Sequence, residues 1–270
     1  MSGFAEDHTF QGDGWHFDYI SFGEGDRPML LLPGVGDGFR TAKGLALPFS
    51  LLYRTFARDF RVYVLSRREP LPKLWSTGDM AKDIACWMEA EGLEQADVVG
   101  VSQGGMIAQW LALLYPQRVR RLVLAVTAAS PTPVMEQALS HWIRLARQRK
   151  FAAIMEDTAR RSYTGAYQRQ GVLQSRLVGR LMPPKEYERF LTLCHSCLTH
   201  SVSDRLWEIT VPTLVLGGER DQVVGAQASL ELARGIPHAK LHFYPGQSHG
   251  VYEQEMTDFN RRIKHFLLNP

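Results

Sequence analysis

The sequence contains little cysteine, only three residues in 270. An odd and low count excludes a disulfide-stapled scaffold and favours a reducing compartment. Cys194 and Cys197 have the C-x-x-C spacing, but they lie in a stretch with helical periodicity, whereas the redox form of this motif follows a strand. A metal site needs a second pair of ligands, and none stands at a suitable spacing. We therefore expect these cysteines to be ordinary helix residues.

Long apolar runs and a strong net charge are also missing. No stretch of about 18 apolar residues is present, which predicts that nothing spans a membrane. Residues 1–13 are polar and acidic rather than a basic start with an apolar run, which predicts no secretory signal and a cytoplasmic protein. A formal charge of +3 argues against nucleic acid as the main partner and leaves a small molecule. The oligomeric state is not readable from the chain.

The sequence does have short apolar strands that alternate with helical patterns. Continuous Val and Leu runs are typical of strands buried on both faces of a parallel sheet. The predicted strands are 15–22, 29–32, 61–65, 96–101, 122–126, 212–216 and 241–244. The predicted helices are 45–57, 77–91, 103–115, 225–234 and 252–268. This order predicts an α/β fold, with a mostly parallel sheet covered by helices on both sides.

Residues 130–205 interrupt this rhythm with helical periodicity and no convincing strand. The segment is interpreted as several helices inserted between two strands, forming a lid over the sheet. It carries 12 Lys and Arg against 6 Asp and Glu. A solvated basic surface is the main interpretation. The alternative is that one or two of its arginines meet an anionic substrate.

A nucleophile motif stands between a predicted strand and a predicted helix. Residues 100–104, Gly-Val-Ser-Gln-Gly, match G-x-S-x-G, and the strand–turn–helix context is the one that a nucleophile elbow requires. The serine of such an elbow sits in a strained turn, and small neighbours allow the strand and helix to approach. Ser102 is therefore the predicted nucleophile. The helix that follows aims backbone N–H groups at the reaction centre.

The partners that a serine nucleophile needs follow in the order acid, then histidine. Asp221 comes just after the strand 212–216, and His249 comes just after the strand 241–244. Both loops lie at the carboxyl edge of a parallel sheet, where such folds build their sites. Asp221 is the predicted acid, with Glu219 as the alternative, and His249 is the predicted base. For the other histidines near these elements, packing or surface roles are expected: His195, His200, His238 and His242.

With these three motifs in place, the chain resembles the α/β-hydrolase superfamily over essentially its whole length. The elbow G-V-S-Q-G-G and the loops L-G-G-E-R-D and G-Q-S-H-G carry the resemblance to the lid-bearing branch of esterases, lactonases and carbon–carbon bond hydrolases. It implies a sheet of about eight strands, a core domain of residues 1–129 and 206–270, and a helical cap of residues 130–205. It also implies an oxyanion hole formed by the backbone amides of Val35 and Gln103.

Two loops depart from the family pattern. Pro33 stands where the family usually has histidine, but the missing N–H is not the donor, so the oxyanion hole should survive. The same loop has Phe39 where G-x-G-x-x-G needs its last glycine, and it lacks the Lys-Ser/Thr of a P-loop, so nucleotide binding is not expected. In the loop after strand 61–65, Arg67 and Arg68 are expected to be structural or exposed, with substrate contact as the alternative.

The identity of the nucleophile narrows the reaction. Epoxide hydrolases and haloalkane dehalogenases of this family use aspartate at the elbow, whereas Ser102 favours acyl transfer on a small ester, lactone or thioester. No metal or organic cofactor is implied. The alternatives are carbon–carbon bond hydrolysis, cofactor-free perhydrolysis and a small-molecule sensor that retains the same residues. Four residues are candidates for an apolar pocket, although most are expected in the core: Phe39, Met106, Trp142 and Tyr163.

Overall fold

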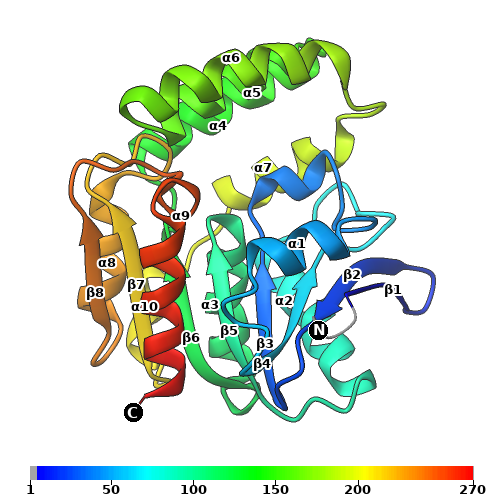
Figure 1. The fold of residues 1–270 in the computed structure, drawn as a ribbon, viewed down its shortest axis with the longest axis vertical. Helices are drawn as coiled ribbons and strands as arrows, with labels where there is room; N and C mark the ends of the chain where they lie inside the picture. The colour runs from blue at the N-terminus through cyan, green and yellow to red at the C-terminus, as the bar shows by residue number, and fades with distance from the viewer. Residues whose placement is uncertain (1–4, 270) are drawn as a thin grey trace.

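The central element of the fold is an eight-stranded sheet with the strand order β1-β2-β4-β3-β5-β6-β7-β8. The structure is a computed structural model that describes residues 5–269 (Figure 1). β1 and β2 pair antiparallel, as do β2 and β4, and all other neighbours are parallel. The strands are β1 (Glu6–Gln11), β2 (His16–Phe22), β3 (Arg27–Leu32), β4 (Phe60–Leu65), β5 (Ala96–Val101), β6 (Val119–Ala125), β7 (Thr213–Gly218) and β8 (Lys240–Tyr244). The predicted fold class, a mostly parallel sheet of about eight strands, is confirmed.

The apolar strands are buried on both faces, which explains why they read as continuous runs. Leu30 and Leu32 of β3 pack into one core cluster, while Met29 and Leu31 pack into another on the opposite face. Successive side chains of a strand point to opposite faces, so both faces of the sheet must be covered.

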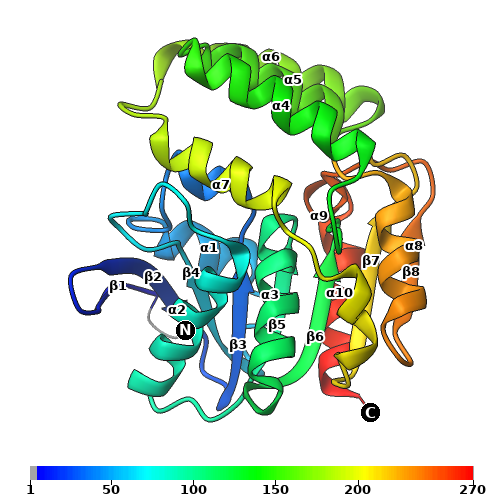
Figure 2. The ribbon, with the colours of Figure 1, turned by 180° about the vertical axis from the view of Figure 1, so that it is seen from behind.

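Helices provide that cover on both sides. α2 (Thr77–Ala90), α3 (Gln103–Leu114) and α8 (Ala226–Gly235) contribute to one cluster, as Figure 2 shows from behind. α1 (Ala46–Leu52), α9 (Val251–Gln254) and α10 (Met256–Leu268) contribute to the other cluster. Two short 3₁₀ helices, η1 (Val35–Gly38) and η2 (Pro116–Arg118), complete this part of the fold.

Some predicted bounds were wrong. The helix predicted for residues 45–57 ends at Leu52, and the chain then turns until β4. The helix predicted for 252–268 is divided at Glu255 into α9 and α10. The strand β1 was not predicted at all, because its side chains are mostly polar and largely exposed at the sheet edge.

Four helices lie between β6 and β7, within the segment 130–205. They are α4 (Pro133–Arg147), α5 (Phe151–Ser162), α6 (Gly165–Leu181) and α7 (Glu188–Leu198), followed by η3 (Ser203–Glu208). α4, α5 and α6 form a layer above the carboxyl edge of the sheet, and α7 lies between this layer and the sheet (Figures 1 and 2). A core cluster joins α4, α5 and α7 to Met106 of α3 and to Val224, which lies between β7 and α8. In the part of the chain that the structure describes, no helix is both long and apolar enough to cross a membrane.

Candidate active site

Ser102 sits in a strained turn between β5 and α3. Its backbone angles are φ 55° and ψ −120°, which a residue other than glycine adopts only when the surroundings enforce them. A Cβ atom at Gly104 would lie 1.9 Å from the carbonyl oxygen of Leu32, and one at Gly100 would lie 2.5 Å from that of Gly104. The glycines of the motif are therefore required by close approach of backbones, as expected for a nucleophile elbow.

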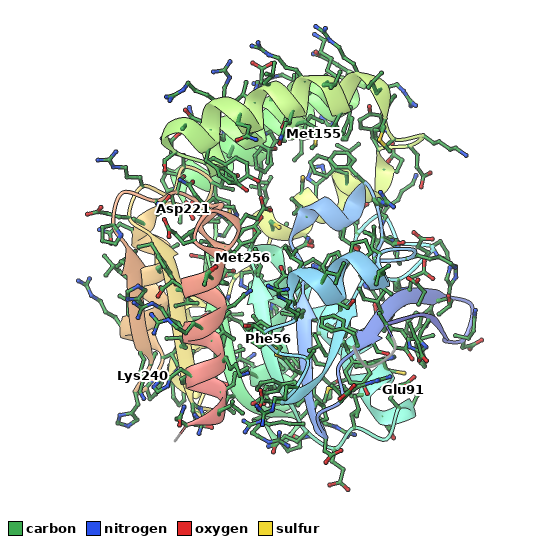
Figure 3. The ribbon with its side chains drawn as sticks, viewed as in Figure 1. Phe56, Glu91, Met155, Asp221, Lys240 and Met256 are labelled. Atoms are coloured by element: carbon green, nitrogen blue, oxygen red, sulfur yellow. The ribbon has the colours of Figure 1, made fainter. Side chains whose placement is uncertain are left out.

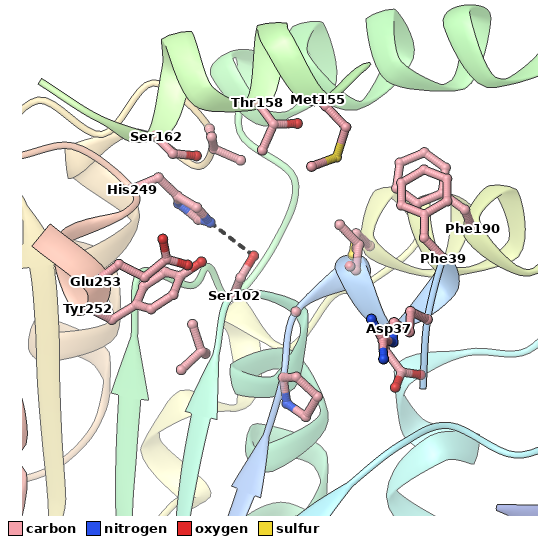
Figure 4. Close-up of a pocket in the computed structure, with 18 of the residues that line it drawn as sticks. Asp37, Phe39, Ser102, Met155, Thr158, Ser162, Phe190, His249, Tyr252 and Glu253 are labelled. Carbon is pink, nitrogen blue, oxygen red and sulfur yellow. Dashed lines mark hydrogen bonds between the residues drawn. The ribbon is translucent and has the colours of Figure 1, made fainter. Parts of the chain in front are cut away.

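The structure brings Ser102, His249 and Asp221 together from three separate loops at the carboxyl edge of the sheet. His249 Nε2 lies 3.1 Å from Ser102 Oγ, and His249 Nδ1 lies 2.9 Å from Asp221 Oδ2. Figure 4 shows the contact between His249 and Ser102, and Figure 3 shows Asp221 at the end of the sheet nearest the inserted helices. The alternative acid, Glu219, is exposed and accepts a hydrogen bond from the Gly246 amide at 2.8 Å instead.

Asp221 is held as a carboxylate by its neighbours. Burial raises the pKa of Asp221. The facing His249 and the amides of Val223 and Val224 lower it by more than burial raises it, so the pKa lies below its usual value. These amides donate to Oδ1 at 2.8 and 2.9 Å, which leaves Oδ2 to accept from His249 Nδ1–H. A carboxylate can only accept, so the Nδ1 proton of His249 points to Asp221, and in the neutral imidazole the Nε2 lone pair then faces Ser102.

Val35 and Gln103 occupy equivalent places next to Ser102. Each is the first residue of a helix, η1 and α3 respectively, where the backbone N–H has no partner inside the helix. Among residues 5–269, neither amide donates a hydrogen bond in the loops around it. A Cβ at Gly34, next to Val35, would lie 3.3 Å from Ser102 Cβ and 3.6 Å from its Oγ, so this loop passes directly beside the serine. Both amides therefore lie in segments beside Ser102 and donate no hydrogen bond within the described loops.

A cavity of about 680 Å³ opens above Ser102, between the sheet edge and the inserted helices. Met155, Thr158 and Ser162 face it from α5, while Phe39 and Phe190 stack with ring centroids 4.0 Å apart (Figure 4). All four candidate pocket residues line it, and two of them, Met106 and Trp142, are also nearly fully buried. The pocket and core interpretations therefore both apply to these residues.

The charged residues that line this cavity are not the arginines of residues 130–205 that the sequence suggested as contacts for an anionic substrate. No arginine of the described segment 130–205 lines it, whereas Arg40 from the loop after η1 does. Glu253 of α9 also faces the cavity beside His249, and the hydroxyl of Tyr163 donates to it. Glu253 and Arg40 could not be identified from the sequence, because neither belongs to a motif.

Arg67 and Arg68 of the loop after β4, and Cys194 and Cys197 of α7, pack against other parts of the fold. Arg67 is buried, and the Arg68 guanidinium lies between the rings of Trp15 and Trp75, 4.7 and 4.5 Å from their centroids. Cys194 and Cys197 lie inside α7, and burial raises the pKa of Cys197 to about 12, so it is a thiol at neutral pH. Within residues 5–269, no three His, Cys, Asp or Glu side chains are grouped to hold a metal ion.

Comparisons with known proteins agree with this fold. The family described as the alpha/beta hydrolase fold matches residues 27–255. The chain is 29% identical over 253 residues to a 2-hydroxymuconate semialdehyde hydrolase of Pseudomonas putida, covering 89% of this chain and 86% of that protein. It is 23% identical over 248 residues to a 3-oxoadipate enol-lactonase of Acinetobacter baylyi, covering 92% and 91%. The solved structure of an alpha/beta hydrolase enzyme from a Medee basin deep-sea metagenome library superposes with a TM-score of 0.87 at 20% identity, covering 97% and 98%.

Proposed function

This chain belongs to the α/β-hydrolase fold family and is a hydrolase, and we propose that it cleaves a small ester, lactone or thioester with Ser102 as nucleophile. The observation that carries the proposal is the chain of contacts from Ser102 Oγ through His249 to Asp221, at 3.1 and 2.9 Å, at the floor of the cavity. Residues 130–205 act in this proposal as a cap that shapes the cavity.

The geometry supports a two-step acyl transfer. Ser102 Oγ attacks the substrate carbonyl carbon while its proton passes to His249 Nε2, and Asp221 stabilises the imidazolium that forms. The carbonyl π electrons move to oxygen, and the Val35 and Gln103 amides stabilise this oxyanion. The tetrahedral intermediate collapses, the C–O or C–S bond breaks, and His249 returns the proton to the leaving group. Water then hydrolyses the acyl-enzyme by the same sequence, with His249 as base.

The cavity predicts the kind of substrate. Its walls are mainly apolar and aromatic, which favours a small molecule with an apolar acyl group. Arg40 is the arginine that lines the cavity, so we propose it as the contact for a substrate that also carries a negative charge.

Carbon–carbon bond hydrolysis is the second candidate. It is favoured by the relative named 2-hydroxymuconate semialdehyde hydrolase, which is matched along nearly its full length. Such a reaction also needs attack on a carbonyl by water or serine and uses the same base and oxyanion hole, so the site geometry alone suits both reactions.

A paired substrate assay separates the two candidates. Purified protein is tested on a series of p-nitrophenyl esters and lactones, and in parallel on a vinylogous dienoate ketone whose absorbance disappears on cleavage. Sustained ester or lactone turnover that is lost in Ser102→Ala and His249→Ala supports the proposal. Turnover of the dienoate alone selects the carbon–carbon candidate. Ester hydrolysis that persists in Ser102→Ala would refute the assigned nucleophile. Binding with no more than one turnover of any substrate would indicate a sensor.

A further inference from the structure

Three buried charged side chains contact the segments that carry Val35 and Gln103. We call Arg67, Asp37 and Arg189 the buried charge cluster; they are 4%, 5% and 9% exposed. The backbone N–H of Arg67 donates to Asp37 Oδ2 at 2.9 Å, and the Arg189 guanidinium donates to the same atom at 2.6 Å. Buried charges are retained only when they are paired and hydrogen-bonded, so this cluster is an organised part of the fold.

The Arg67 guanidinium joins two segments that are distant in sequence. Its Nη2 donates to the carbonyl oxygen of Pro33 and, at 3.1 Å, to Gln103 Oε1, while Nη1 donates to the carbonyl of Leu65 at 3.3 Å. Pro33 lies two residues before Val35, and Gln103 carries the second amide itself. A single side chain therefore contacts both segments beside Ser102.

The side chain of Gln103 is held from its other end as well. It is fully buried, and its Nε2 donates to the carbonyl of Leu193 at 2.8 Å and to Ser196 Oγ at 2.9 Å, both in α7. These acceptors fix the amide so that Oε1 faces Arg67. Rotation of Gln103 away from its present place would leave buried polar atoms without partners, which is costly.

Resting on the proposed function, we propose that Arg67 is a positioning residue of the oxyanion hole. Its guanidinium ties the Pro33–Val35 segment to Gln103 and thereby sets the separation of the two amides that receive the oxyanion. Arg67 does not line the cavity, so it acts through these two segments and does not touch the substrate. The Asp37–Arg189 pair holds the same loop to α7 from the other side.

Arginine suits this place better than lysine. A guanidinium has several donors in a rigid planar fork, so it binds two or three oxygens at once, whereas an ammonium group is a compact point charge on a flexible stem. Burial lowers the pKa of Arg67 to about 10, with the nearby Asp37 opposing that effect, so the side chain remains charged at neutral pH.

The test compares Arg67→Met and Arg67→Lys with a matched control, Arg68→Met. Arg68 is the neighbouring cation, but its side chain contacts Asp83 and two tryptophan rings and neither Pro33 nor Gln103. We expect kcat for ester hydrolysis to fall about 100-fold in Arg67→Met and about 10-fold in Arg67→Lys, with KM nearly unchanged, because misplaced oxyanion donors affect mainly the transition state. The affinity for a boronic acid that forms a tetrahedral adduct should fall in parallel. Arg68→Met should keep wild-type kcat.

Backbone amide resonances give a readout that does not depend on turnover. The Val35 and Gln103 amides should shift in both Arg67 variants and stay in place in Arg68→Met, while thermal unfolding checks that each variant is folded. If Arg67→Met does not fold, Arg67→Lys decides. An active wild type with unchanged kcat and unchanged amides in Arg67→Lys would overturn this inference alone. An inactive wild type would overturn the proposed function, and the amide shifts would still decide the role of Arg67.

Discussion

Replacing Asp221 by asparagine should reverse the tautomer of His249. Asp221 Oδ1 accepts two hydrogen bonds, from the amides of Val223 at 2.8 Å and Val224 at 2.9 Å. Because both partners are donors, the asparagine must keep its oxygen at that position. Its NH₂ group then faces His249 Nδ1, which has to act as an acceptor, and the imidazole proton moves to Nε2. Nε2 then no longer has a lone pair to take the Ser102 proton.

The expected loss is large because the geometry is kept while the base is disabled. For a serine–histidine–aspartate arrangement, this substitution lowers kcat by about 10⁴-fold, which corresponds to about 5 kcal/mol in the activation free energy. The assay is p-nitrophenyl ester hydrolysis by Asp221→Asn, together with the ¹⁵N shifts of the His249 ring, which should show the proton on Nε2.

Glu219→Gln is the matched control for this prediction. Glu219 is the alternative acid, and glutamine still accepts from the Gly246 amide, so activity should remain at the wild-type level. An Asp221→Asn variant that is folded and keeps more than about a tenth of wild-type activity would contradict the role of Asp221 as the acid that orients His249. Loss of activity in Glu219→Gln instead would transfer the acid role to that residue.

Three further predictions concern stability and the cavity. Gly104→Ala should lower the free energy of unfolding by at least about 2 kcal/mol, because its Cβ would lie 1.9 Å from a backbone oxygen. Gly36→Ala is the control and should not lower it, because its Cβ would meet nothing within 4 Å. Equal denaturation midpoints for the two variants would contradict this prediction. Burial lowers the pKa of His200 to about 3, so the unfolded chain takes up the proton first and unfolding free energy should fall as the pH drops from about 6.5 towards 3. His200→Gln should make the free energy of unfolding less dependent on pH in this range. An unchanged dependence would contradict the role given to His200. Trp142→Ala should cost about 3–5 kcal/mol and shift ester preference towards longer acyl chains; an unchanged chain-length profile would exclude Trp142 from the acyl site.

Local sequence patterns specify the strands, most of the helices and the three proposed catalytic residues, Ser102, His249 and Asp221. These features were therefore predictable. An apolar run buried on both faces reads as a parallel strand, and a serine between small residues at a strand–helix turn reads as an elbow. β1 was missed because an edge strand with exposed polar side chains lacks any apolar period. Its pairing with β2 is what defines it as a strand.

The buried charge cluster was beyond prediction for a different reason. Asp37 and Arg189 are 152 residues apart in sequence, and their contact exists only because α7 lies over η1. In the sequence, Arg67 was interpreted as structural or exposed, and the structure shows it buried among backbone carbonyls. Contacts of this kind depend on tertiary packing, so no local sequence pattern indicates them.

In the proposed mechanism, Ser102 forms a covalent acyl-enzyme. Mixing the protein with a p-nitrophenyl ester, quenching with acid within the first turnover and mapping the peptides by mass spectrometry tests it directly. The proposed mechanism predicts one acyl group on the peptide that contains Ser102. This acyl group should be absent in Ser102→Ala and should accumulate when hydrolysis of the acyl-enzyme is slowed. Turnover with an acyl group on any other residue, or with none in wild type under conditions where p-nitrophenol appears as a burst, would contradict it.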